Sequence, residues 1–136
     1  MADRGNSFKS IRDTVAHILG AEIVWYSRWH GQSVKLPSAD QYPTVESLRT
    51  AWMAHEQKVR SFVDALGADE VNRMFEYTLF NGTPGATPFA HMLQHVVNHA
   101  TYHRGQVTTM LRQMGAAPPK SMDLIAFYRE RREVKT

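Results

Sequence analysis

Residues 91–115 read HMLQHVVNHATYHRGQVTTMLRQMG, in which a histidine recurs at every fourth position from His91 to His103. On a helical wheel at about 100° per residue, the apolar residues from position 89 to position 114 form one stripe. The stripe consists of Phe89, Met92, Leu93, Val96, Ala100, Val107, Met110, Leu111 and Met114. His103 falls inside the stripe and His99 on its flank, whereas His95 lies near the boundary and His91 points towards solvent. The pattern predicts a long amphipathic helix that directs two imidazoles at the core.

Two imidazoles at positions i and i+4 lie one turn apart on the same face of a helix. Their nitrogens can converge on one cation at about 2.0–2.1 Å, the usual zinc–imidazole distance. Burial without a partner would cost each imidazole a hydrogen bond, so a metal, a carboxylate or a water is expected beside them. The residue pattern alone therefore leaves two alternatives for His99 and His103, a metal site or a pair of partly buried polar side chains.

The sequence before this segment predicts two further long helices. Ser7 or Ser10 can cap the first, which runs to about His30 and is followed by a glycine. Thr44 can cap the second, which ends near Gly67. The residues between the two helices are polar, include two prolines and are expected to form a loop.

Between the second and third helices, residues 72–86 are rich in aromatic residues and end in a glycine-rich turn, which predicts an extended segment or a small hairpin. Thr87-Pro88 predicts the start of the third helix, with a capping hydroxyl followed by proline, and Gly115 its end. Ser121 is expected to cap a last, shorter helix that runs to about Arg132. The predicted fold is all-α, a four-helix-bundle type with three long helices and a short C-terminal one.

Composition bounds the class of protein. The 136 residues predict a single domain over 1–136. The absence of cysteine excludes disulfides, thiolate zinc sites and a cysteine nucleophile. No long apolar stretch or signal-like start is present, so we expect a cytoplasmic chain with no membrane partner. The net charge of +3 is spread along the chain, which argues against a nucleic-acid partner.

Periodicity leaves two candidates for a third metal ligand. His55 falls within the apolar stripe of the second helix, so wheel geometry alone favours it. His17 lies off the main apolar stripe of the first helix, beside smaller residues. A local hydrogen bond would account for either histidine equally well.

Glu22 projects from the middle of the apolar stripe of the first helix, where an unpaired carboxylate is costly. It needs a partner, either a histidine N–H, Arg104 or water at a rim. We expect a structural or ligand-orienting role for Glu22 rather than a catalytic one, and no catalytic or substrate-binding residue is assigned.

Two separated motifs carry a family resemblance. They are SIRDTVAHILGAEIVWYSRWHG, from Ser10 to Gly31, and HVVNHATYHRGQVTTMLRQMG, from His95 to Gly115. Together with Tyr42-Pro43-Thr44 and the tail DLIAFYRE, residues 123–130, they resemble the DinB-like family of damage-inducible and related bacterial proteins. The resemblance extends over most of the chain.

The resemblance implies a four-helix bundle with a mononuclear site of three histidines. Carried over by position, the metal ligands are His17, His99 and His103, which replaces the wheel-based preference for His55. Because a helix in a bundle has neighbours on two sides, a ligand can lie off its most apolar stripe. Arg104 and Gln106 also belong to the later motif and are assigned only helix-packing or ligand-supporting roles.

Members of the family usually begin with a further amphipathic helix, where this chain has only about six residues before the early motif. The expectation is that the start was assigned too late or that a partner chain fills the gap. A monomer would then expose a large apolar patch and self-associate as a homo-oligomer, a dimer.

Three imidazoles with open positions suit Zn²⁺, Ni²⁺ or another first-row divalent metal. The resemblance implies a metal-dependent thiol S-transferase-like enzyme acting on a small-molecule electrophile in stress response or detoxification. Its cosubstrate would be a low-molecular-weight thiol such as bacillithiol or mycothiol. The alternatives are a metal-dependent hydrolase with Glu22 as general base, and a non-catalytic helical binding or assembly module with a structural or vestigial metal site.

Overall fold

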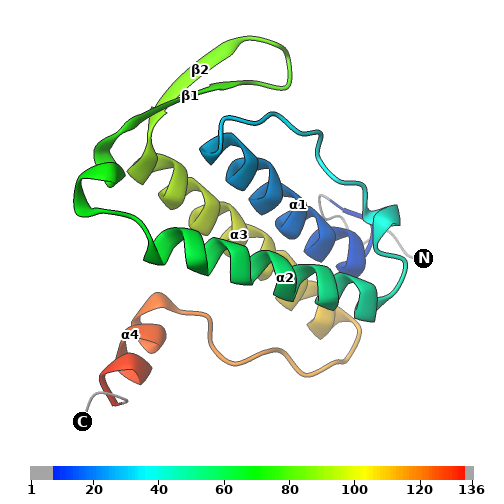
Figure 1. Ribbon diagram of the computed structural model, residues 1–136. Helices are drawn as coiled ribbons and strands as arrows, with labels where there is room; N and C mark the ends of the chain where they lie inside the picture. The colour runs from blue at the N-terminus through cyan, green and yellow to red at the C-terminus, as the bar shows by residue number, and fades with distance from the viewer. Residues whose placement is uncertain (1–7, 134–136) are drawn as a thin grey trace.

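Three long helices and a β-hairpin dominate the structure, a computed structural model that describes residues 8–133. The elements in chain order are α1 Ile11–Trp29, the 3₁₀-helix η1 Ala39–Gln41, α2 Val45–Asp64, the 3₁₀-helix η2 Ala68–Asn72, β1 Met74–Thr78, β2 Pro84–Pro88, α3 Phe89–Gln113 and α4 Leu124–Glu133. In Figure 1, α1, α2 and α3 lie side by side, the hairpin covers one end of them, and α4 stands apart. The predicted mostly helical fold with four helices and a small hairpin is confirmed.

The core is built on α1, which packs most extensively against α3 and also contacts α2. One cluster of buried residues lies between α1, the following loop and α2, and consists of Ala16, Leu19, Tyr42 and Leu48. A second cluster joins the end of α1 to the hairpin and the start of α3, and consists of Trp29, Phe75, Phe89 and Met92. Burial of these side chains fixes α1 against α2 through the first cluster, and against the hairpin and the start of α3 through the second.

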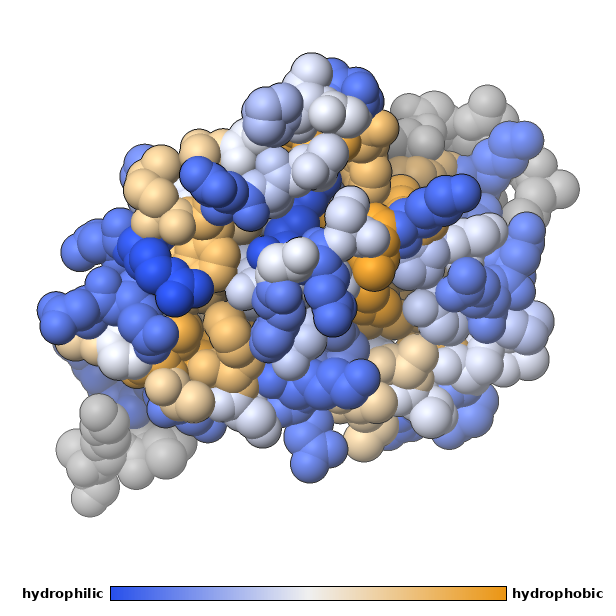
Figure 2. All heavy atoms as spheres, turned by 45° about the horizontal axis from the view of Figure 1, so that its top comes forward, coloured by the Kyte–Doolittle hydropathy of each residue, from blue (hydrophilic) through white to orange (hydrophobic). Residues whose placement is uncertain are grey.

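The surface is of mixed polarity. On the face seen in Figure 2, apolar side chains gather in separate patches between hydrophilic ones. The apolar side chains of α4, namely Leu124, Ile125, Phe127 and Tyr128, are all exposed, because this helix packs little against the other three. Within residues 8–133, no helix combines the length and hydropathy needed to cross a bilayer.

The two strands form an antiparallel hairpin in which Met74 pairs with Pro88 and Thr78 pairs with Pro84. Gly82 has a φ of 85°, a left-handed conformation that glycine adopts without strain in the connecting turn. A Cβ on Gly85 would approach the Tyr77 ring to 3.0 Å, so glycine there allows the ring to lie against the opposite strand.

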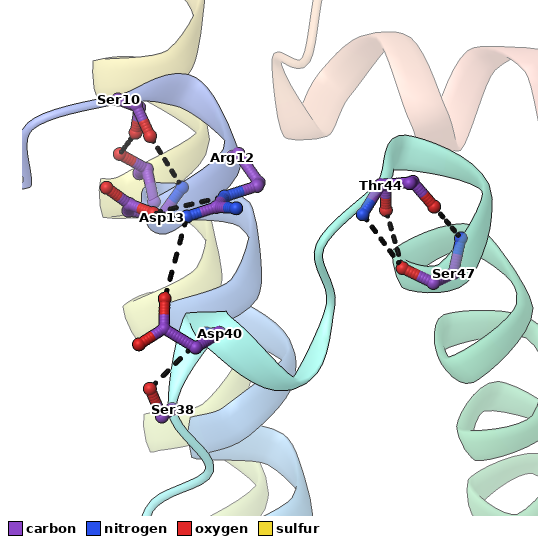
Figure 3. Close-up of polar contacts among 8 residues, drawn as sticks. Ser10, Arg12, Asp13, Ser38, Asp40, Thr44 and Ser47 are labelled. Carbon is purple, nitrogen blue, oxygen red and sulfur yellow. Dashed lines mark hydrogen bonds and ion pairs between the residues drawn. The ribbon is translucent and has the colours of Figure 1, made fainter.

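The caps of α1 and α2 follow the predicted chemistry (Figure 3). The Ser10 hydroxyl accepts the Asp13 N–H at 3.0 Å at the start of α1, whereas the alternative cap, Ser7, lies outside the described residues. Thr44 and Ser47 form a reciprocal capping box at the start of α2. Gly31 follows α1 with a φ of 70°, as expected for the residue after a helix end.

Two predicted helix starts differ from the structure. Helix α3 begins at Phe89, and Thr87 belongs to β2, where its hydroxyl bonds the Tyr77 hydroxyl at 2.9 Å instead of capping the helix. Pro88 keeps a strand-like ψ of 139° and is not the first helical residue. At α4, the Ser121 hydroxyl accepts the Asp123 N–H at 3.3 Å, and the helix begins one residue later.

Candidate metal centre

Three histidines from two helices meet on the seam between α1 and α3. His17 on α1 faces His99 and His103 on α3, and each offers one ring nitrogen so that the three nitrogens lie within 4.8 Å of one another. The Nε2 atoms of His17 and His99 are 3.1 Å apart. In a tetrahedral zinc site, ligand nitrogens lie about 3.3 Å from one another. Small rotations of these side chains would therefore bring the three nitrogens to metal-binding geometry.

The orientation of His103 is fixed by a neighbour on its own helix. The distance from His103 Nδ1 to Gln106 Oε1 is 2.7 Å. An amide oxygen only accepts hydrogen bonds, so Nδ1 carries the proton and Nε2 keeps its lone pair. This supports the ligand-orienting role expected for Gln106, because a second hydrogen bond fixes the tautomer of a histidine ligand.

The surroundings of the cluster favour neutral imidazoles. Burial, acting together with the nearby His103, His17 and His95, lowers the pKa of His99 to about 4. Burial also lowers the pKa of His17, with His103 acting in the same direction. Both side chains are thus uncharged at neutral pH, which is the form that binds a metal.

Aromatic side chains lie against two of the three imidazoles, those of His17 and His103. The Phe8 ring lies 4.5 Å from the His17 ring and 5.6 Å from the His103 ring, so it covers one side of the cluster. Tyr102 makes an edge contact with His103 at 5.0 Å. No sequence pattern indicated Phe8, because it precedes the first helix and belongs to no periodic stripe.

His91, His95 and His55 are exposed or buried as their positions on the wheel suggest. His55, however, is not a ligand of the cluster, although the wheel favoured it. His91 and His95 are exposed, and His95 reaches the cluster only through a ring contact with His99 at 5.8 Å. His55 is buried, as its place in the apolar stripe predicted, but it faces Glu22 on α1 and not the imidazole cluster. The helical wheel predicted that the His55 side chain is buried, but it could not predict which helix this side chain contacts.

Glu22 and His55 form a pair between α1 and α2. Their closest atoms, Oε2 and Nε2, are 3.7 Å apart, which is too long for a hydrogen bond, and His55 Nε2 is sealed from solvent without a partner in the described chain. Burial raises the pKa of Glu22, against a lowering by Arg104, while burial lowers the pKa of His55. Both shifts favour the neutral forms.

The donor set fits a divalent metal. Three imidazole nitrogens converge, one has its tautomer fixed, and the pKa values of two others are lowered. Imidazole ligands suit zinc, nickel, copper and iron. Three protein ligands leave coordination positions open, as in catalytic sites.

The fold and the site together define a class: a helical-bundle protein with three histidines, from two antiparallel helices, that could hold a metal ion. The family model described as DinB family matches residues 1–133, and the chain belongs to this family.

Two relatives illustrate the range of the similarity. Protein DinB of Bacillus subtilis (strain 168) is 25% identical over 129 residues, which cover 88% of this chain and 74% of that protein. The crystal structure of a DinB-like protein from Bacillus cereus ATCC 10987, solved at 2.01 Å resolution, is similar with a TM-score of 0.56 and 24% identity. That likeness covers 82% of this chain and 73% of the other, and it concerns the fold.

Proposed function

We propose that this protein is a metal-dependent enzyme of the thiol S-transferase type, with His17, His99 and His103 as the ligands of a divalent metal, zinc or nickel. The observation that carries the proposal is the convergence of three imidazole nitrogens from α1 and α3 within 4.8 Å. Membership of the DinB family supports the assignment of these residues, because both motifs of the family resemblance contribute to the cluster.

A divalent metal at this site would supply a Lewis acid that keeps a bound thiol deprotonated near neutral pH. The residues of the chain prepare the site for that chemistry. Gln106 holds the Nδ1 proton of His103, so that Nε2 faces the cluster, and burial keeps His17 and His99 uncharged. Phe8 limits access of water from one side.

In the proposed reaction, the thiolate sulfur of a low-molecular-weight thiol forms a bond to an electrophilic carbon of a small molecule. The leaving group departs with the electron pair of the bond that breaks. The hydrolase alternative requires a general base beside the three histidines. Glu22, the one candidate from the sequence, faces His55 on the other side of α1, so the transferase is the better-supported function.

The metal site is tested by mass-spectrometric metal analysis of protein purified without a histidine tag. We expect near-stoichiometric metal in the parent after incubation with Zn²⁺ or Ni²⁺, and none in the variant His99→Ala/His103→Ala. The matched control is His91→Ala/His95→Ala, which removes two exposed imidazoles from the same helix and should keep the metal. Equal metal content in all three proteins, or none in the parent, would overturn the proposed site.

The transferase activity is tested by following the loss of free thiol in the presence of a small electrophile. The metal-loaded parent should consume thiol faster than the metal-free parent and the His99→Ala/His103→Ala variant. If the electrophile is also followed, its metal-dependent loss without loss of thiol would support the hydrolase instead.

We also propose that the chain forms a homodimer through α4. Its apolar side chains are exposed, and a pocket of about 960 Å³ between α3 and α4 is lined by apolar residues including Leu93, Val97 and Phe127. The apolar face of α4 in one copy would pack into this pocket of the other, an isologous arrangement that two-fold symmetry closes.

A further inference from the structure

Arg28 is buried at the end of α1, far along the helix from the imidazole cluster. Only 6% of the residue is exposed, although it carries a charge. It lines a pocket of about 510 Å³ between the end of α1, the loop that follows it and the β-hairpin. The sequence around Arg28, with Trp25 before it and Trp29 after it, did not indicate a site here.

The guanidinium is surrounded by aromatic rings. Its central carbon lies 4.6 Å from the Trp25 ring centroid, 5.1 Å from that of Tyr77 and 5.1 Å from that of Phe80. Such rings attract a cation but offer no acceptors for its five N–H groups. Across residues 8–133, no carboxylate lies within ion-pair distance of Arg28, and no hydrogen bond of its side chain is found.

The N–H groups of Arg28 remain accessible from the pocket. The side-chain polar atoms that are sealed without a partner in the described chain are Trp29 Nε1 and His55 Nε2, and no guanidinium nitrogen is among them. Burial lowers the pKa of Arg28, while Tyr77 acts in the opposite direction, yet an arginine stays protonated in proteins. Arg28 is therefore a buried, charged fork of donors that lines an open pocket and has no acceptor among residues 8–133.

The pocket walls are suited to a small organic anion. Tyr77 is held in place by the hydrogen bond of its hydroxyl to Thr87, and Gly85 leaves room for its ring. Gln32 and Ser33, in the loop after α1, add polar groups to the lining. Glu76 also lines the pocket but is not paired with Arg28, so it leaves the guanidinium available.

From this arrangement we propose that the pocket at Arg28 binds the carboxylate of a small organic acid. The planar fork of an arginine matches a carboxylate with two parallel hydrogen bonds, and the aromatic rings around it exclude competing water. The site is independent of a metal at the histidines.

The pocket and the imidazole cluster nevertheless lie on one face of α1. Arg28 follows His17 by eleven residues, or three helical turns, which corresponds to about 16 Å along the axis. Between them, the Trp25 ring contacts His95 at 5.0 Å, and His95 in turn contacts His99. A bound carboxylate would thus lie on the same face of α1 as His17, at the end of the helix that meets the hairpin.

The proposal is tested on the metal-free chain by ¹⁵N-HSQC titration with sodium succinate, with acetate and inorganic phosphate as separate probes at constant ionic strength. We expect saturable shifts of the Arg28 Nε–H signal and of the Ser33 and Gly85 amides with succinate. Arg28→Lys keeps the charge but loses the planar fork, so its affinity should be about tenfold weaker. Circular dichroism establishes that the variant is folded.

The matched control is Arg73→Gln, because Arg73 also lies over an aromatic ring, that of Phe75 at 4.4 Å, but is exposed to water. Its affinity for succinate should equal that of the parent. The proposal is overturned if no carboxylate shifts these signals, if phosphate alone binds, or if Arg28→Lys binds as tightly as the parent.

Discussion

At the scale of single residues, the Glu22–His55 pair shows how two titratable side chains are accommodated between helices without a charge. The carboxylate of Glu22 is about four-fifths buried, with 21% of its side chain exposed, and its closest partner atom is 3.7 Å away. An ion pair at this distance would not offset the free-energy cost of burying two charges. Neutral side chains avoid that cost.

The raised pKa of Glu22 predicts an unusual pH dependence of stability. Between the ordinary value of 4.5 and the raised native pKa, the folded chain binds more protons than the unfolded chain, so the contribution of Glu22 to stability falls as pH rises through this window. Glu22→Gln removes that dependence. The variant should therefore gain stability relative to the parent as pH rises, measured by urea unfolding from about pH 5 to pH 8.

His55 acts in the opposite direction, since its lowered pKa adds stability that is lost as pH falls below 6.5 towards the native pKa. It is present in both proteins, so the difference between them isolates Glu22. Glu130→Gln, at an exposed position on α4, is the control and should differ from the parent by a constant amount. A difference for Glu22→Gln that does not vary with pH would contradict the prediction.

The same pair marks the limit of the helical wheel. Periodicity correctly placed His55 and His103 in the interior, since a side chain within an apolar stripe is buried wherever the stripe packs. It could not place His17, because which neighbour meets each face depends on how α1 packs between α2 and α3. The family motifs supplied that missing information, and the structure brings His17 to the α3 histidines.

At the scale of secondary-structure elements, the helix starts were predicted correctly where the capping residue makes only local contacts. Ser10 and Thr44 cap α1 and α2 as predicted, because their hydroxyls meet no competing partner. Thr87 failed as a cap because the hairpin offers it the Tyr77 hydroxyl. That contact spans ten residues and depends on strand register, which the Thr-Pro dipeptide does not encode.

The capping box of α2 predicts a measurable loss. Thr44→Ala removes the acceptor for the Ser47 N–H and should lower the free energy of unfolding by about 1 kcal/mol in urea titrations. The control is Thr50→Ala, an exposed position inside the same helix, where alanine should leave stability unchanged or slightly higher. An equal loss in both variants would mean that the box does not stabilise α2.

At the scale of the whole molecule, the position of α4 is the feature that the sequence could least predict. Its residues predicted a short helix, and the helix is present, but its apolar side chains find no cover within the described chain. The expectation of an exposed apolar patch rested on the family resemblance, and the structure locates apolar exposure on α4 and on neighbouring parts of α3, such as Val97.

Self-association through α4 predicts that the chain sediments as a dimer at micromolar concentration. Phe127→Glu places a charge in the centre of the proposed interface, and it should shift the chain to the monomer. Because α4 contributes little to the packing of α1, α2 and α3, the variant should keep the helical content and unfolding midpoint that the parent shows once it is diluted to the monomer.

Arg129→Glu changes an exposed charge on the same helix and tests whether charge alone disrupts the dimer. This variant should remain dimeric, since salt-screened surface charges contribute little to association compared with buried apolar area. A parent that sediments as a monomer would refute the homodimer. A Phe127→Glu variant that remains dimeric would instead show that the copies associate through a surface other than α4. In both cases the histidine cluster is unaffected, because its residues belong to α1 and α3 of one chain.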